Sequence, residues 1–222
     1  LTSLDSINCV TLESLYCREN LLTTVDANKF PMLTSLGCSG DQLTNVNVER
    51  CLKLSYLDIS YAQLTNLNLE NNTLLSKLHC NCNSLLTNLD VTHNSALEWL
   101  DCAFCQLESL KIGDSPVLTY IRCEDNQLTT LDVSGCPALE QLSCEENQLT
   151  TLDVSHCPKL HLLHCSDNNL EILDVSKTSI RGVASFSYFL KCNMWSLRTL
   201  YVGTYPIEGI TYDRTEGCIS PY

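Results

Sequence analysis

Residues 142–160 read "LSCEENQLTTLDVSHCPKL", and residues 121–139 read "IRCEDNQLTTLDVSGCPAL", almost the same text 21 residues earlier. The leucine that opens each unit recurs in steps of 21 residues, with a single step of 22. These leucines are Leu12, Leu33, Leu54, Leu75, Leu97, Leu118, Leu139 and Leu160. A fixed period of this size is typical of a repeat architecture in which every unit is one coil. The sequence therefore predicts eight stacked coils, preceded by a partial coil that contains Leu1 and Leu4.

Each repeat contains two short apolar segments with the alternation of a half-buried strand. In "LEQLSC", the apolar side chains of Leu142 and Cys144 flank polar Ser143, and "LTTLDVS" at 149–155 alternates in the same way. A single coil cannot bury its own apolar side, so coils must stack at the ~4.8 Å spacing of neighbouring strands. We expect a solenoid with a shared core and a length on the order of 40 Å.

The repeat pattern, L-x-x-L-x-C-x-x-N-x-L-T-x-L-D-V-S-x-C-P-x, resembles a leucine-rich repeat (LRR). It is similar to the 21-residue bacterial type of Bacteroidetes surface proteins and, more distantly, of internalins, and it covers about residues 1–176. The resemblance implies that the "LxxLxC" segments form one parallel sheet. It also implies that the following Asn turns inward to bond the backbone of an adjacent coil. This position holds Asn20, Asn83, Asn126, Asn147 and Asn168, whereas Asp41, Ala62 and Cys105 depart from it.

The second segment of each repeat favours a straight rod. "LTxLDVS" is alternating and β-branched, without helical spacing, so both sides of the solenoid should advance by similar amounts per coil. We therefore predict a β-rich LRR solenoid with parallel strands on both faces, little helix, low curvature and a shallow groove.

Residues 177–222 differ in composition from the repeats. They concentrate the aromatic residues Phe186, Tyr188, Phe189, Trp195, Tyr201, Tyr205, Tyr212 and Tyr222. An open solenoid end leaves its core and a strand edge bare, and an aromatic cap would cover both. We expect the solenoid to span 1–176 and residues 177–222 to form a degenerate last coil, "SLRTLYVG" at 196–203, with a C-terminal cap. The alternative is a hinge to a further domain.

Composition limits the classes of partner. The chain is 44% hydrophobic, yet no stretch approaches the ~20 apolar residues of a membrane span. Acidic residues outnumber basic residues 26 to 13, and the net charge of −13 opposes nucleic acid, whose binding depends on Lys and Arg neutralising phosphates. The first residues, "LTSLDSINC", already belong to a repeat, so no signal peptide is visible.

The 15 cysteines predict structure rather than chemistry. Seven occupy the inward position of the first segment, where a free cysteine behaves as a small hydrophobe. They are Cys17, Cys38, Cys80, Cys102, Cys123, Cys144 and Cys165. Disulfides along this column would distort the sheet, because parallel strands hold Cβ atoms farther apart than the ~3.8 Å of a disulfide. A metal site is not expected at "CNC" (80–82) or "CAFC" (102–105), since their thiols point to different sides and zinc needs four converging donors.

The aspartate of "LDV" recurs on the outside of the second segment. Its members are Asp5, Asp26, Asp90, Asp132, Asp153 and Asp174. Short acidic side chains after a strand favour local hydrogen bonds that close a turn. We predict such capping for this column, with a bound cation such as calcium as the alternative.

Outward positions of the first segment vary from coil to coil, as the contact positions of a binding surface would. In the third to sixth coils they gather aromatic side chains beside polar and charged ones, a combination typical of contact surfaces. The predicted ligand-binding residues are Tyr56, Asp58, Lys77, His79, Trp99, Asp101, Tyr120 and Arg122. The alternative is an ordinary exposed face with scattered aromatics.

No motif for catalysis is present in the sequence, including "GxSxG", "HExxH" and phosphate-binding glycine loops. We therefore predict a non-enzymatic module without a cofactor that binds a protein or a carbohydrate. The resemblance implies a cell-surface or secreted bacterial protein. The alternative function is a structural spacer, a stalk within a larger adhesin that has no ligand of its own.

Overall fold

The computed structural model describes residues 9–40, 42–180, 190–192 and 196–201, and it describes strands 206–208, 211–212 and 219–220 by their backbone alone. Several residues named above lie outside this part of the chain. They are Leu1, Leu4, Asp5, Asp41 and six aromatic residues of the expected cap, Phe186, Tyr188, Phe189, Trp195, Tyr205 and Tyr222.

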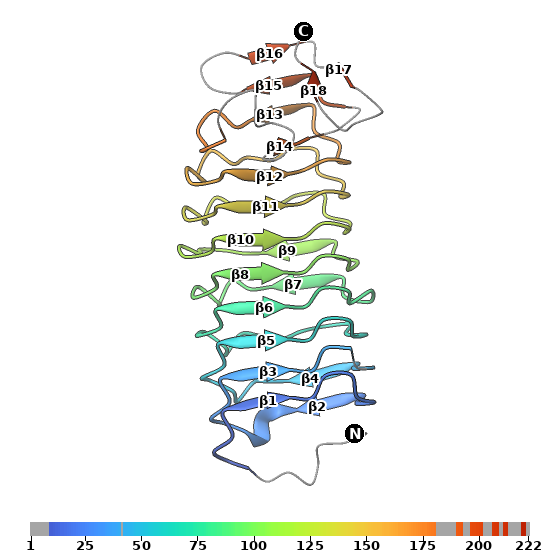
Figure 1. Ribbon diagram of the computed structural model, residues 1–222, viewed down its shortest axis with the longest axis vertical. Helices are drawn as coiled ribbons and strands as arrows, with labels where there is room; N and C mark the ends of the chain where they lie inside the picture. The colour runs from blue at the N-terminus through green and yellow to red at the C-terminus, as the bar shows by residue number, and fades with distance from the viewer. Residues whose placement is uncertain are drawn as a thin grey trace.

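Within the described residues, nine parallel strands form the largest sheet, which we call the first face (Figure 1). In sheet order they are β1 (Ser14–Tyr16), β3 (Ser35–Gly37), β5 (Tyr56–Asp58), β6 (Lys77–His79), β8 (Trp99–Asp101), β10 (Tyr120–Arg122), β11 (Gln141–Ser143), β12 (Leu162–His164) and β14 (Leu190–Lys191). Neighbours pair in register, so Leu57 stands beside Leu78 and Leu78 beside Leu100. Side chains of equivalent positions therefore form columns along the rod, which Figure 1 shows to be nearly straight.

The other side of the rod, the second face, carries separate small sheets instead of one continuous sheet. Their strands are β2 (Thr24–Asp26), β4 (Asn45–Asn47), β7 (Asn88–Asp90), β9 (Ser109–Lys111), β13 (Ile172–Asp174) and β15 (Thr199–Tyr201). The described residues contain one helical element, the single 3-10 turn η1 (Ala27–Lys29), and no helix with the length and hydrophobicity to cross a bilayer. The predicted parallel β-solenoid with strands on both faces and little helix is confirmed.

The prediction of a strand in every second segment is wrong for three coils. Residues 66–68, 130–132 and 151–153 form no strand, although Leu152 and Val154 are buried as expected. Where strands do pair on this face, each aspartate stands beside an uncharged residue or a lysine, as in Asp26–Asn47, Asp90–Lys111 and Asp174–Tyr201. A ladder through the later coils would align aspartates, which repel by roughly 1 kcal/mol at strand spacing even in water.

Aspartates of the second face close their own turns. Asp132 Oδ1 accepts the N–H of Ser134 at 2.9 Å, and Asp153 Oδ1 accepts that of Ser155 at 2.8 Å. Hydrogen bonds from these serines lower the pKa of both carboxyls because they stabilise the charged form. The predicted capping role is confirmed for these residues. Across the described chain, no group of three or more His, Cys, Asp or Glu is placed to hold a metal ion.

Buried asparagines tie consecutive coils together. Asn147 donates through Nδ2 to the carbonyl oxygen of Cys123 in the preceding coil at 2.9 Å, and its Oδ1 accepts the N–H of Leu128 at 2.9 Å. The same pattern recurs at Asn83, Asn126 and Asn168. In one coil that departs from the pattern, the Cys105 thiol donates to the carbonyl of Cys80 at 3.4 Å. A weaker donor there replaces part of the asparagine's contribution.

The inward cysteines form a column of buried side chains, as predicted. Its central members, Cys80, Cys102, Cys123, Cys144 and Cys165, are fully buried free thiols. At the N-terminal end, the Sγ atoms of Cys17 and Cys38 lie 3.1 Å apart and form a hydrogen bond. Burial raises the pKa of the five central thiols well above the ordinary value, and neighbouring acidic groups raise it further. The thiol column is therefore uncharged packing material.

The last coil is completed after an insertion. β14 joins the first face with Leu190 beside Leu163, which places Cys192 next to Cys165 in the thiol column. The "SLRTLYVG" segment supplies β15, which pairs with β13 on the second face, and β16 (Pro206–Glu208) runs antiparallel to β15. β17 (Thr211–Tyr212) and β18 (Ile219–Ser220) form a further antiparallel pair. The division of the chain at residue 176 and the capping role of the segment after it stay predictions.

Candidate functional site

The eight residues predicted to contact a ligand lie on the outer side of strands β5, β6, β8 and β10. The alternation that buries the middle residue of each strand turns the first and third outward. The register arranges them in two columns, Tyr56–Lys77–Trp99–Tyr120 and Asp58–His79–Asp101–Arg122. The structure thus brings all eight together on one face. That they bind a ligand stays a prediction.

Four of these side chains form a continuous aromatic run. The ring centroids of Tyr56 and His79 are 5.7 Å apart, and those of His79 and Trp99 are 6.1 Å apart. Trp99 and Tyr120 stack face to face, with centroids 3.6 Å apart and planes inclined by 14°. Burial is the main cause that raises the pKa of the Tyr56 and Tyr120 hydroxyls, so both stay protonated donors at neutral pH. The run is a packed ladder of half-buried rings.

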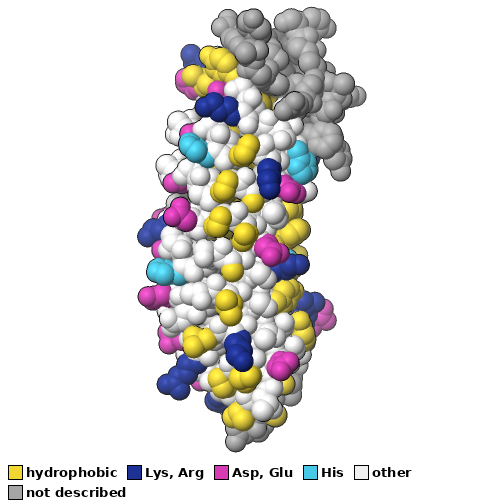
Figure 2. All heavy atoms as spheres, turned by 90° about the vertical axis from the view of Figure 1, so that its left-hand side faces the viewer, with side chains coloured by type: hydrophobic (Ala, Val, Ile, Leu, Met, Phe, Trp, Pro, Cys, Tyr) yellow, Lys and Arg dark blue, Asp and Glu magenta, His cyan; other side chains and the backbone are white. Residues whose placement is uncertain are grey.

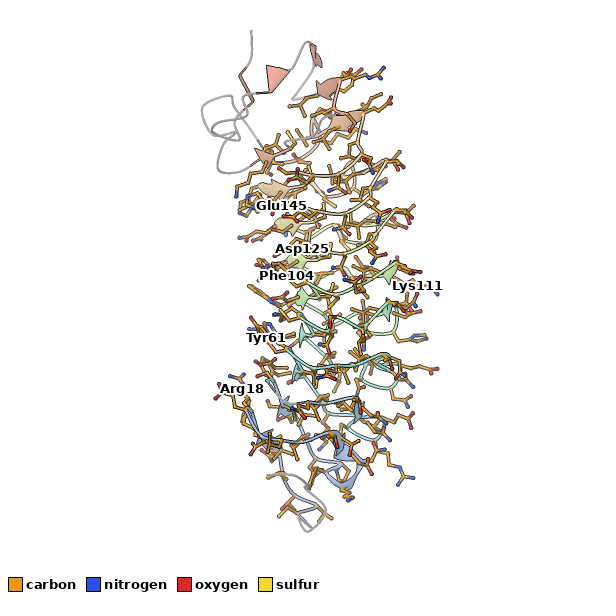
Figure 3. The ribbon with its side chains drawn as sticks, turned by 90° about the vertical axis from the view of Figure 1, so that its right-hand side faces the viewer. Arg18, Tyr61, Phe104, Lys111, Asp125 and Glu145 are labelled. Atoms are coloured by element: carbon orange, nitrogen blue, oxygen red, sulfur yellow. The ribbon has the colours of Figure 1, made fainter. Side chains whose placement is uncertain are left out.

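Because Gly37 has no side chain, two residues of the first coil reach this surface across the second coil. A Cβ at Gly37 would meet the Tyr16 ring at 2.7 Å, so the ring lies over the space that a side chain would occupy. Its centroid reaches within 6.5 Å of Tyr56, and the Arg18 guanidinium spans the same gap to Asp58 at 2.8 Å. The sequence analysis did not predict Tyr16 and Arg18 as site residues. They reach Tyr56 and Asp58 only because Gly37, which lies between them, has no side chain to block the way. Figure 3 labels Arg18 on this side of the rod.

Both outward carboxylates of the site are buried and engaged. Asp58 is 7% exposed and accepts the Arg18 ion pair, and Asp101 is 6% exposed and lies 3.3 Å from Arg122 Nη1. Arg122 also donates through Nε to Glu124 Oε1 at 2.9 Å. Glu124 was not predicted, because it follows the strand and belongs to the turn. The two arginine–carboxylate groups fix the two ends of the aromatic run.

Two polar atoms at this site lack a hydrogen-bond partner among the described residues. They are the indole N–H of Trp99 and Oε2 of Glu124, and both are buried. A buried donor or acceptor without a partner typically costs about 1–3 kcal/mol. Asn72 Oδ1 and Asn94 Oδ1, at the corner that precedes the first-face strands, are likewise buried without a partner, so these atoms do not by themselves distinguish the site.

The arrangement offers contact groups rather than an assembled catalytic set. His79 packs between Tyr56 and Trp99, and the neighbouring carboxylates of Asp58 and Asp101 are held by arginines. The side chains can stack, donate and accept hydrogen bonds, and pair with charges.

Apolar side chains also line the edge of the rod that precedes the first-face strands. Their most exposed members are Val10, Leu52, Leu74 and Val117. Figure 2, which views this edge, shows hydrophobic side chains following one another along the rod. On the second face, Leu67–Glu70, Asp90 and His93 surround a shallow cavity of about 180 Å³.

No protein-family model and no curated protein matches the sequence. Solved structures do match. A leucine-rich repeat protein of Leptospira interrogans is 22% identical over 83% of this chain and 54% of its own, with a TM-score of 0.67. The chain has a leucine-rich repeat fold.

Two further solved structures are similar. TLR13, solved in complex with ssRNA13, is 19% identical over 86% of this chain and 28% of its own, with a TM-score of 0.56. The functional domain of InlJ from Listeria monocytogenes, whose structure is described as including a cysteine ladder, is 26% identical over 97% of this chain and 54% of its own, with a TM-score of 0.48. The present leucine-rich repeat chain spans about half the length of the Leptospira and Listeria structures.

Proposed function

We propose that this chain is a non-enzymatic recognition module whose first face binds a protein ligand through the aromatic run. The packed rings of Tyr56, His79, Trp99 and Tyr120 carry the proposal. Rigid aromatic side chains supply large contact area and lose little conformational entropy on binding, and they are enriched among residues that dominate binding energy. The arginine groups on either side add polar contacts that fix the orientation of a ligand.

A protein suits this surface better than a carbohydrate does. Sugars pack their apolar C–H faces against an open aromatic face. Trp99 and Tyr120 cover one face of each other, the His79 ring lies 6.1 Å from that of Trp99, and Gln141 is the strand neighbour of Tyr120 on its other side. The rings therefore present edges outward, where peptide carbonyls and side chains can approach the ring hydrogens.

Nucleic acid is not the ligand that we propose, although the TLR13 structure with ssRNA13 shares the fold. The net charge of −13 disfavours a polyanion. Arg18 and Arg122 already pair with carboxylates of the same face, so they offer little positive charge to phosphates.

We further propose that the module acts at a bacterial cell surface or in secreted form, as the resemblance of the repeats implies. A spacer is the second candidate function, and the straight rod in Figure 1 favours it. A spacer needs length and stiffness only. It would not need the aromatic run.

A ligand screen with matched variants tests this function. The purified chain is applied to arrays of surface and secreted proteins and of glycans, and binding is then measured for Trp99→Ala, Tyr120→Ala and Thr151→Ala, the last an exposed control on the second face. We expect a protein ligand whose affinity falls at least tenfold for the two aromatic variants, about 1.4 kcal/mol or more, with an unchanged control. Absence of any ligand, or full affinity of both aromatic variants, would favour the spacer.

A further inference from the structure

One residue in each coil adopts a left-handed backbone at the turn that follows the first-face strand. These residues, which we call the turn edge, are Glu19, Gly40, Tyr61, Cys82, Phe104, Asp125, Glu146 and Asp167. Left-handed backbone is unfavourable for L side chains and least so for glycine and short polar residues. Tyr61 at φ 56° and Phe104 at φ 54° are bulky aromatics in this conformation. The chain tolerates this cost in two coils beside the aromatic run.

These two side chains project from the rod on a rigid backbone. Tyr61 is 65% exposed and Phe104 is 48% exposed. The backbone N–H of Tyr61 donates to the carbonyl of Asn81 in the next coil at 2.9 Å, and that of Phe104 donates to Glu124 at 2.9 Å. Figure 3 shows both on the same side of the rod as Arg18, Asp125 and Glu145, away from Lys111. They lie two coil spacings apart, about 10 Å, and the smaller Cys82 of the coil between them separates them.

Carboxylates continue the same edge toward the C-terminal coils. We call Asp125, Glu145, Glu146 and Asp167 the acidic stretch. Within the described chain, no Lys or Arg lies within ion-pair distance of Asp125, Glu146 or Asp167, and His164 lies 3.9 Å from Glu145. A hydrogen bond with Asp125, and the charge of that residue, raise the pKa of Glu146. Negative charge is thus crowded in the coils that follow Phe104, on the same edge as the two projecting aromatics.

We propose that the turn edge is a second interaction surface, which docks a basic segment of a partner protein. Apolar side chains of the segment contact Tyr61 and Phe104, and its lysines or arginines lie over the acidic stretch. Charge complementarity selects this occupant. A membrane surface does not fit, because anionic lipid head groups would be repelled by the acidic stretch beside the aromatics. The surface goes beyond the proposed first-face function, since it uses a different edge and different residues.

Peptide binding to the full chain tests the proposal. The probe is a fluorescent twelve-residue peptide with two leucines followed by four lysines, compared with the same peptide carrying glutamates and with phosphatidylserine vesicles. We expect the lysine peptide alone to bind, and to bind at least tenfold more weakly to the double variants Tyr61→Gly/Phe104→Gly and Asp125→Asn/Glu146→Gln. Leu74→Ala, an exposed apolar residue on the opposite edge, should bind as the wild type does.

Stability separates a docking defect from a folding defect. Glycine relieves the left-handed strain, so the Tyr61→Gly/Phe104→Gly variant should melt at the same or a higher temperature while it loses the peptide. Undiminished binding by that variant, equal binding of the glutamate peptide, or preferential binding of vesicles would each overturn the proposal. Trp99→Ala reports on the first face separately. If Trp99→Ala lost binding of the lysine peptide while Tyr61→Gly/Phe104→Gly kept it, the peptide would bind at the first face. That result would contradict the turn-edge proposal and leave the proposed first-face function unaffected.

Discussion

Raising the pH from 8 to 10 is expected to unfold the protein cooperatively, because the folded state keeps a large set of thiols protonated. Burial raises the pKa of the Cys51, Cys105 and Cys157 thiols from 9.0 to about 11, and of Cys136 and Cys192 to about 12. The pKa values of the five central thiols of the inward column lie well above 9.0. The unfolded chain releases these protons near pH 9, so folding stability is full below that pH and falls as the pH rises toward the folded pKa values.

The summed free-energy cost of the buried thiols is large enough to unfold the protein. At pH 10 each such thiol costs the folded state about 1.4 kcal/mol, so these groups together cost on the order of 10 kcal/mol. This is comparable to the whole stability of a typical domain, about 5–15 kcal/mol. Urea unfolding under reducing conditions at half-unit pH steps measures the slope directly.

Serine variants supply a matched control for the alkaline transition. Ser115 occupies the corner position that Cys136 and Cys157 occupy in later coils, so the fold already accommodates a hydroxyl there. The double variant Cys136→Ser/Cys157→Ser removes two titrating groups. Its stability should fall less steeply with pH, by about 2.7 kcal/mol per pH unit. An unchanged slope, or a wild type that stays folded beyond pH 11, would contradict the thiol explanation.

The repeat period fixes the architecture from sequence because coil, register and burial all follow from one 21-residue unit. Leucine spacing predicts the first face, and the inward Cys and Asn columns appear where the pattern places them. Pairing on the second face did not follow from pattern alone. Repulsion disfavours a ladder that aligns Asp132 with Asp153, but residues 66–68 also form no strand although Asn68 is uncharged, so charge explains only part of the difference. β14 escaped prediction because an insertion displaces Leu190 from the 21-residue phase.

Within the candidate site, alternation places outward residues but not the contacts between them. It correctly grouped the columns that begin at Tyr56 and Asp58 on one face. The reach of Arg18 across Gly37 depends on three coils at once, and no single repeat contains that information. The sequence analysis did not identify Tyr61. Most other coils carry an acidic residue or glycine at the same turn position, and such residues indicate a structural turn and not a contact site.

Replacing Asn147 with leucine is expected to lower the free energy of unfolding by about 2–6 kcal/mol, even though leucine is similar in size and more hydrophobic. The side chain bonds four backbone groups of the solenoid, one of which is the carbonyl of Glu145 at 3.0 Å from Nδ2. Nδ2 donates to the carbonyls of Cys123 at 2.9 Å and Cys144 at 3.2 Å, and Oδ1 accepts the N–H of Leu128 at 2.9 Å. Leucine would leave the N–H of Leu128 buried without a partner, at about 1–3 kcal/mol. The carbonyls of Cys123 and Cys144 would keep the Nδ2 donors of Asn126 and Asn168, so each of these two lost bonds adds only about 0.5–1.5 kcal/mol. Urea unfolding at pH 7 measures the difference.

The same position in another coil provides the control. Cys105 donates to the carbonyls of Cys80 and Ala103 at 3.4 and 3.5 Å, and a thiol is a weak donor. Cys105→Ala should therefore cost about 1–2 kcal/mol, most of it for the lost sulfur packing. If Asn147→Leu cost no more than Cys105→Ala, the solenoid would be held by leucine and thiol burial alone. A larger loss for Asn147→Leu means that the asparagine bonds between coils also hold the register, because a coil shifted by one residue could not place Nδ2 and Oδ1 against the same backbone groups.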